Sequence, residues 1–205
     1  MHNKQMKGRQ NKASYGIVLL AAGMSSRLGR PKQLLAYQGD YLVNHAIKAT
    51  EQVKDAVTVV IIGAEAETLL NEIKNVGVKV VLNQQFKEGM SSSIRCGVQY
   101  IQDYDRNIEN IIIMVCDQPF VTAEYLHTLM ERHAHTGAPM VASRYASSHG
   151  VPALFHKALF QSMGEINDHH GAKKIIEANL PIAEIVDFQE GAYDIDTPDD
   201  MSRLF

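Results

Sequence analysis

Short runs of apolar residues recur along the chain and are separated by longer segments of mixed character. The runs are rich in Val and Ile and do not alternate strictly with polar residues, which is typical of strands covered on both faces. They predict buried strands at 16–21, 56–62, 78–82, 110–116 and 139–143. Segments of helical length lie between them, near 41–54, 64–75, 89–103 and 122–135. This alternation predicts right-handed βαβ units, and hence a mostly parallel sheet with helices on both faces.

The pattern changes after Ser143. The stretch "HGVPALFHKALF" predicts a small hairpin at the edge of the sheet, followed by a helix. A further helix is expected in "HHGAKKIIEANL", a strand in "IAEIVDF", and a last helix that begins with Thr197 as N-cap and Pro198 in its first turn. Because no repeat or linker interrupts the pattern, the sequence predicts one Rossmann-like α/β domain over 14–205.

Composition is ordinary for a soluble globular protein, with 45% apolar and 21% charged residues among 205. A net charge of −3 argues against broad binding to nucleic acid, and the apolar runs are too short to span a membrane. Residues 1–13 carry four basic groups and no acidic one, and no apolar segment follows directly, so we expect a flexible tail rather than a secretion signal. Cys96 and Cys116 both lie in buried patterns, which suits a reducing cytoplasm.

A loop with two glycines, "AAGMSSRLGRPK", follows the first predicted strand. Five residues separate Gly23 from Gly29, and Arg30 follows, so the loop fits neither the Walker A nor the dinucleotide-binding pattern. Gly23 nevertheless lets backbone N–H groups approach a ligand, and Arg27 and Lys32 add positive charge. A solvated surface loop is the alternative. Its position at the carboxyl end of a parallel sheet favours an anion-binding loop.

Two other segments carry acidic residues at positions suited to a binding site. Asp117 ends the buried run "IIIMVCD", and Asp194 and Asp196 lie two apart in "YDIDTPDD", where an extended backbone would place both carboxylates on one face. Such oxygen ligands suit a hard cation. Turn formation or helix capping is the alternative for each aspartate.

One more segment combines a glycine with serines at a predicted helix start. In "KEGMSSSIRCG" the backbone N–H groups and hydroxyls are suited to hold an anion, and ordinary N-capping is the alternative.

Taken together, these motifs resemble those of the MobA-like nucleotidyltransferases. "LLAAGMSSRLGRPK" resembles the family signature L-A-x-G-x-S-x-R-[ML]-G-x-x-K, and "CDQP" and "DIDTP" resemble its C-D-x-P and D-I-D-T-P motifs. "GMSSSIRCG" and "HGVPALF" are similar to two further family segments. The resemblance runs from about residue 15 to the C-terminus, with the motifs in the family's order.

The resemblance implies roles for individual residues in a fold like that of nucleotide-diphospho-sugar transferases. Catalysis is assigned to Arg27, Lys32 and Asp117. Nucleotide binding is assigned to Leu20, Ala21, Ala22, Gly23, Ser25, Arg27, Lys32, Gly89, Ser92 and Ser93. Acceptor binding is assigned to Gly150, Pro152 and Gly171, and Mg²⁺ binding to Asp117, Asp196 and Asp194.

The pair Ala21-Ala22 resembles the molybdenum cofactor cytidylyltransferase branch, including PucB-type accessory proteins of purine catabolism. This branch implies transfer of CMP from CTP to molybdopterin, release of pyrophosphate, and delivery to a xanthine dehydrogenase-type molybdoenzyme. Another phosphorylated acceptor, such as a sugar phosphate, and a non-catalytic cofactor carrier remain alternatives. The chain departs from the branch in "NDHHGAKK", where His169 stands in place of an aspartate, His170 follows it and Lys173 replaces an arginine, which leaves the acceptor-side residues open.

Overall fold

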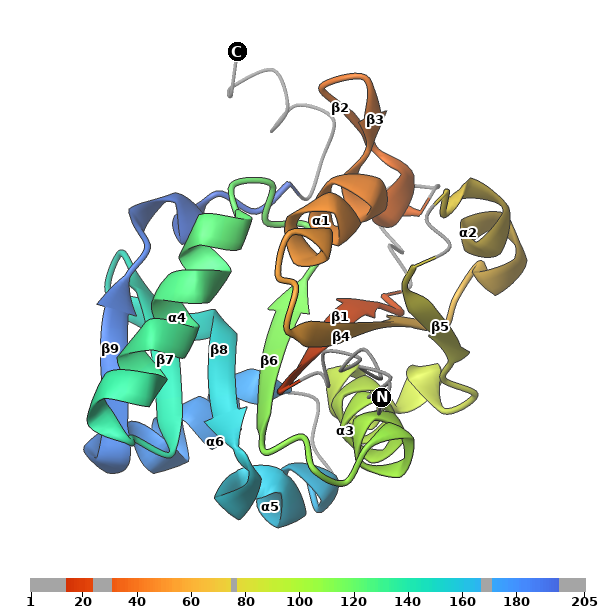
Figure 1. Ribbon diagram of the computed structural model, residues 1–205. Coiled ribbons are helices and arrows are strands. Elements are labelled where there is room, and N and C mark those ends of the chain that lie inside the picture. The colour runs from red at the N-terminus through yellow and green to blue at the C-terminus, as the bar shows by residue number, and fades with distance from the viewer. Residues whose placement is uncertain (1–13, 24–30, 75–76, 167–170, 196–205) are drawn as a thin grey trace, which may run out of the picture.

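The computed structural model describes residues 14–23, 31–74, 77–166 and 171–195, and within them it confirms the alternation of strands and helices. The described strands of the main sheet lie in the order β5-β4-β1-β6-β8-β7-β9 (Figure 1). Their bounds are Tyr15–Ala21 for β1, Ala56–Ile62 for β4, Lys79–Leu82 for β5, Asn110–Val115 for β6, Met140–Tyr145 for β7, Ser148–His156 for β8 and Ala183–Asp187 for β9. A separate two-stranded hairpin is made of β2, Ala36–Tyr37, and β3, Asp40–Tyr41.

The main sheet is mostly parallel, as predicted. Strands β5, β4, β1 and β6 are parallel neighbours, and β7 runs parallel to β9. Only β8 runs antiparallel to both of its neighbours, β6 and β7, among these strands.

The predicted hairpin forms from β7 and β8, but its predicted place at the sheet edge is wrong. Strand β8 lies inside the sheet between β6 and β7, and β9 takes the edge. The reason is burial: Ala153, Leu154 and Phe155 are fully inaccessible, and an edge strand could not cover such a run on both sides.

Helices cover both faces of the sheet. In β1, Ile17 and Leu19 belong to one apolar cluster, packed with α1, α2 and α4, whereas Val18 and Leu20 belong to a second cluster with α3, α5 and α6. The α-helix bounds are Leu42–Glu51 for α1, Ala66–Glu72 for α2, Met90–Tyr104 for α3, Ala123–Thr136 for α4, Phe160–Gly164 for α5 and Ala172–Asn179 for α6. Short 3₁₀ turns lie at Lys32–Leu34 (η1), Phe86–Glu88 (η2), Lys157–Leu159 (η3), Leu180–Ile182 (η4) and Gln189–Ala192 (η5).

Helix α3 lies unusually close to β1. A Cβ atom at Gly97 would come within 2.3 Å of Val18 Cγ1, and one at Gly16 within 2.9 Å of Ile101 Cγ2. Both distances are shorter than van der Waals contact, so the absence of side chains at these two glycines permits the close packing.

Strand order reverses at β1, because β4 lies on one side of it and β6 on the other. Open α/β sheets bind ligands in the crevice at the carboxyl ends of the strands on either side of such a reversal. The loop after Gly23 and the segment at Asp117 both begin at this crevice. No helix in the described part of the chain is long and apolar enough to cross a membrane.

Candidate active site

Lys32 and Asp117 meet at the carboxyl edge of the sheet. Asp117 follows β6 by two residues, and η1 brings Lys32 to it from the loop after β1. The Lys32 ammonium forms an ion pair with Asp117 Oδ2, and the two side chains retain 22% and 16% of their exposure. The structure therefore places together two residues that the sequence assigned to phosphate and metal binding.

The second carboxylate oxygen of Asp117 is the more informative one. Asp117 Oδ1 is buried and has no hydrogen-bond partner among the described atoms. An unpaired buried carboxylate oxygen is costly, and a divalent cation with oxygen ligands would satisfy it. Within the described residues no three His, Cys, Asp or Glu side chains gather into a metal-binding group, so such a cation would complete its shell with other ligands.

Ile195, in the C-terminal aspartate motif, contacts the backbone of Asp117. Its N–H donates to the carbonyl of Asp117 at 3.0 Å, and Asp194 directly precedes it in the chain. Ile195 itself is fully buried and packs against Leu35, Tyr37 and Leu42. This small apolar cluster holds Ile195 against the β2–β3 hairpin and the start of α1.

The Tyr145 side chain lies against Gly150. A Cβ atom at Gly150 would lie 1.9 Å from Tyr145 Oη, so the hydroxyl occupies the space that a side chain would need. Burial raises the pKa of Tyr145, the Asp194 and Asp117 carboxylates raise it further, and a hydrogen bond with Gln118 acts in the opposite sense. Gly150 thus contacts a tyrosine whose pKa responds to the Asp194 and Asp117 carboxylates.

Pro152, the second predicted acceptor residue, is buried within β8. Its carbonyl accepts a hydrogen bond from the Ser143 hydroxyl, so this residue stabilises the sheet. A contact between Pro152 and an acceptor stays a prediction.

The predicted serines have protein partners. Asn83 Nδ2 donates to Ser92 Oγ at 2.8 Å and to Ser93 Oγ at 3.0 Å, and all three residues are buried. Ser92 Oγ also lies 2.8 Å from the carbonyl of Gly89. These hydroxyls hold the connection between β5 and α3 in place, and nucleotide contacts by Ser92 and Ser93 stay predictions.

Two glycine segments meet at the start of α3. Gly89 precedes the helix with a φ of +96°, and Gly171 has a φ of +58°. A Cβ atom at Gly171 would lie 2.6 Å from Met90 Sδ. The predicted nucleotide-side and acceptor-side segments are therefore neighbours.

Arg95 of α3 connects these two segments. Its guanidinium donates to Glu88 Oε2 at 2.9 Å and to the carbonyl of Ile166. Lys173, which replaces the family's arginine, lies 3.8 Å from Glu177 on an exposed helix face.

Several predicted residues lie outside the described part of the chain. They are Ser25, Arg27, His169, His170 and Asp196, together with the tail 1–13 and the C-terminal helix expected from Thr197. Of the others, Leu20, Ala21 and Ala22 are buried at the end of β1, and Gly23 is exposed.

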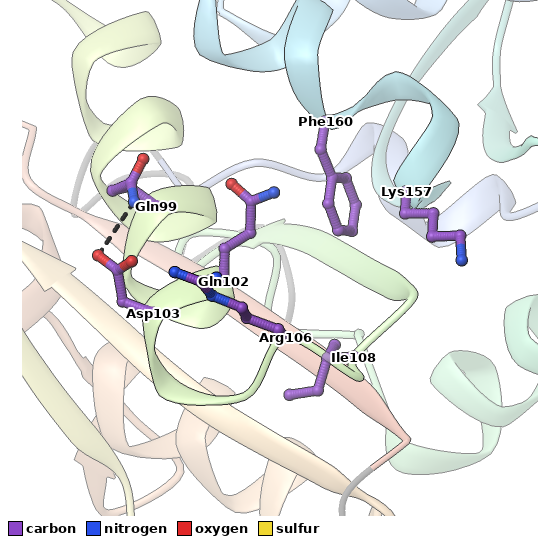
Figure 2. Close-up of a pocket in the computed structure, with 7 residues that line it drawn as sticks. All are labelled: Gln99, Gln102, Asp103, Arg106, Ile108, Lys157 and Phe160. Carbon is purple, nitrogen blue, oxygen red and sulfur yellow. Dashed lines mark hydrogen bonds between the residues drawn. The ribbon is translucent and has the colours of Figure 1, made fainter.

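A separate pocket of about 490 Å³ lies between the end of α3 and the start of α5 (Figure 2). Ile108 precedes β6, so the pocket lies at the amino edge of the sheet, opposite Asp117. Its lining residues are Gln99, Gln102, Asp103, Arg106, Ile108, Lys157 and Phe160. It is distinct from the candidate active site.

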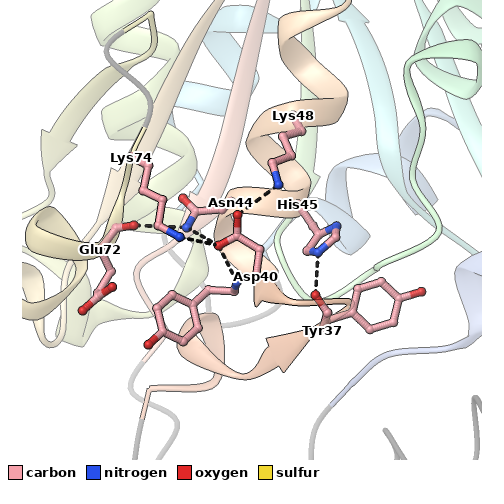
Figure 3. Close-up of polar contacts among 8 residues, drawn as sticks. Tyr37, Asp40, Asn44, His45, Lys48, Glu72 and Lys74 are labelled. Carbon is pink, nitrogen blue, oxygen red and sulfur yellow. Dashed lines mark hydrogen bonds and ion pairs between the residues drawn. The ribbon is translucent and has the colours of Figure 1, made fainter.

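A polar network ties the β2–β3 hairpin to its two neighbouring helices (Figure 3). Asp40 accepts hydrogen bonds from Asn44 at 2.9 Å, Lys48 at 2.9 Å and Lys74 at 3.2 Å. Lys48 first, and then Asn44 and Lys74, hold the pKa of Asp40 well below its usual range. Asn44 also donates to the carbonyl of Glu72 in α2 at 3.1 Å.

Fold and site together define an α/β protein of the nucleotidyltransferase class. Residues 17–183 match the model of the MobA-like NTP transferase domain, and the chain belongs to this family. This confirms the family that the sequence motifs indicated.

Three relatives show how far the likeness extends. Nicotine blue oxidoreductase of Paenarthrobacter nicotinovorans is 26% identical over 199 residues, covering 91% of this chain and 94% of that protein. A probable molybdenum cofactor guanylyltransferase of Bacillus mycoides is 30% identical over 178 residues, covering 80% and 86%. The crystal structure of Rv0371c from Mycobacterium tuberculosis H37Rv superposes with a TM-score of 0.82 at 25% identity, covering 94% and 97%.

Proposed function

We propose that this protein transfers a nucleotidyl group, CMP from CTP, to the terminal phosphate of molybdopterin and releases pyrophosphate. The observation that carries the proposal is the Lys32–Asp117 pair, located where the strand order reverses, with an Asp117 Oδ1 that has no partner among the residues the structure describes. Membership of the MobA-like family supports the reaction class. The relative named a probable molybdenum cofactor guanylyltransferase supports the acceptor.

The main obstacle to this reaction is the approach of two polyanions, so positioning and charge neutralisation supply most of the catalysis. Lys32, with Arg27 as predicted from the motif, binds the triphosphate and offsets the charge of the departing pyrophosphate. Asp117, with Asp194 and Asp196, would hold a divalent cation, for which Mg²⁺ is proposed. That cation neutralises phosphate oxygens when bound. A phosphate nucleophile is already anionic, and therefore no strong general base is needed.

The preference for CTP rests on the resemblance of Ala21-Ala22. Ala22 is only 8% exposed. Its Cβ lies 3.0 Å from the position that a Cβ of Gly63 would occupy, so its methyl group packs toward the end of β4. Since the relative from Bacillus mycoides carries a guanylyl name, CTP and GTP are compared directly in the test.

The test measures pyrophosphate release with Mg²⁺, each of the four nucleoside triphosphates, and either molybdopterin or a sugar phosphate. We expect release with CTP and molybdopterin. Release with a sugar phosphate but not with molybdopterin would overturn the proposed acceptor, and equal rates with CTP and GTP would overturn the base preference.

Two other outcomes would mean that the protein does not catalyse nucleotidyl transfer. Tight molybdopterin binding without nucleotide turnover would identify a carrier. Redox turnover without pyrophosphate release would identify an oxidoreductase, a case raised by the relative named nicotine blue oxidoreductase. Delivery of the product to a xanthine dehydrogenase-type molybdoenzyme is the last part of the proposal, and reconstitution of that enzyme's activity tests it.

A further inference from the structure

We propose that Gln33 is a positioning residue for nucleotide binding, which fixes the backbone at Ala21 and Gly23 where the chain leaves β1. The inference rests on the proposed function only in requiring that the protein bind a nucleoside triphosphate. Gln33 is not part of the signature that predicted the site. It lies on η1, directly after Lys32.

The contacts of Gln33 are specific. Its side chain is buried, with 2% exposure, and Nε2 donates to the carbonyl of Ala21 at 2.8 Å and to that of Gly23 at 3.0 Å. A primary amide nitrogen carries two hydrogens, so both hydrogen bonds can form at once. Both acceptors belong to the backbone where the chain leaves the sheet.

These hydrogen bonds act on the most permissive point of the backbone. Gly23 has no side chain to restrict its dihedral angles, and a Cβ atom there would lie 3.8 Å from Gln33 Nε2. Because the peptide unit is planar, fixing the direction of a carbonyl also fixes the direction of the N–H group joined to it. Gln33 therefore sets the direction in which the loop leaves β1.

The short turn that carries Gln33 also spans the point where strand order reverses. Lys32 pairs with Asp117 after β6, and Gln33 bonds to the end of β1. The turn is closed by hydrogen bonds from Leu34 N–H to the Pro31 carbonyl and from Leu35 N–H to the Lys32 carbonyl, each 3.0 Å long. It thus holds Lys32 and the backbone of Gly23 in one fixed relation.

The test compares nucleotide binding in the wild type and in Gln33→Met, which keeps the length of the side chain and removes both donors. Isothermal titration with CTP or GTP and Mg²⁺, without acceptor, measures the dissociation constant. We expect a rise of roughly tenfold, the effect of losing two buried hydrogen bonds that orient the loop. The KM for the acceptor should stay unchanged in turnover assays.

Asn44→Leu is the matched control. Asn44 is another buried amide, 3% exposed, and its two hydrogen bonds go to Asp40 and Glu72. This variant should lose stability and keep the nucleotide dissociation constant of the wild type. A Gln33→Met protein that binds nucleotide within about twofold of the wild type would overturn the proposal, whatever its stability.

Gln33→Glu supplies a second readout that general destabilisation would not produce. A buried carboxylate facing two carbonyls has a raised pKa, and only its neutral form can donate one of the two hydrogen bonds. Its nucleotide affinity relative to the wild type should therefore improve from about pH 8 to about pH 6. A flat ratio over this range would contradict the proposal. The binding titrations contain no acceptor, so they test the role of Gln33 separately from the proposed reaction. If turnover assays showed transfer to a sugar phosphate, the proposed acceptor would be wrong, and the measured nucleotide affinities would still stand.

Discussion

At the scale of single residues, Lys32 carries the electrostatic part of the proposed mechanism. Replacing it by methionine keeps most of the side-chain volume and removes the cation that pairs with Asp117. We expect Lys32→Met to lower pyrophosphate release by about 100-fold, the effect of losing one preorganised charge, with an unchanged circular dichroism spectrum.

Lys48→Met is the control for charge alone. Lys48 also pairs with an aspartate, Asp40, at 2.9 Å, but lies outside the site and is 56% exposed. It should keep full activity. Equal losses in the two variants would mean that Lys32 has no special role.

Gly150 leaves room for the Tyr145 hydroxyl. The Cβ atom in Gly150→Ala would lie 1.9 Å from Tyr145 Oη, and we expect overpacking to lower the free energy of unfolding by about 1–3 kcal/mol in urea titrations. Adding Tyr145→Phe removes the clashing oxygen and should recover part of that loss. If the stability losses of Gly150→Ala and Tyr145→Phe simply added in the double variant, the clash with Tyr145 Oη would not be the cause of the Gly150→Ala loss.

At the scale of elements, Asp40 joins the β2–β3 hairpin to α1 and α2. Its pKa is lower in the folded protein than in the unfolded chain, so its carboxylate stabilises the fold above about pH 4, and this contribution is lost as the pH falls toward the folded value. Asp40→Asn should lower the free energy of unfolding by about 1–2 kcal/mol at neutral pH. Urea unfolding at several pH values should show that this difference from the wild type becomes smaller in acid.

Asp187 provides the comparison for an exposed pair. Its carboxylate accepts from Arg144 at 2.7 Å but is 58% exposed, and Asp187→Asn should leave stability unchanged because such pairs are screened by solvent. A pH-independent difference for Asp40→Asn would contradict the role given to its charge.

At the scale of the whole molecule, local patterns predicted most of the fold. The buried runs that begin at Tyr15, Ala56 and Asn110 form the strands expected of them, because apolar β-branched runs fit a sheet covered on both faces. The internal position of β8 was not predictable in this way, since strand order depends on pairing between distant segments.

The candidate site also has residues that local sequence patterns predicted and residues that they did not. Lys32, Asp117 and Asp194 could be found from motifs, because their chemistry is visible in their side chains and spacing. Gln33, Asn83 and Tyr145 could not, since an amide or a phenol in an apolar context has no signature until its partners are known. The place of Gln33 directly after Lys32 is visible in the sequence, but its burial appears only in the structure.

The proposal as a whole requires that pyrophosphate release depend on Asp117. The direct measurement is release from CTP in the presence of Mg²⁺ and molybdopterin, compared between the wild type and Asp117→Asn, a variant that keeps the side-chain shape and removes the charge. We predict rapid release by the wild type and a loss of at least about 100-fold in the variant. Equal rates in the two proteins, or no release by a wild type that binds molybdopterin, would contradict nucleotidyl transfer at this site.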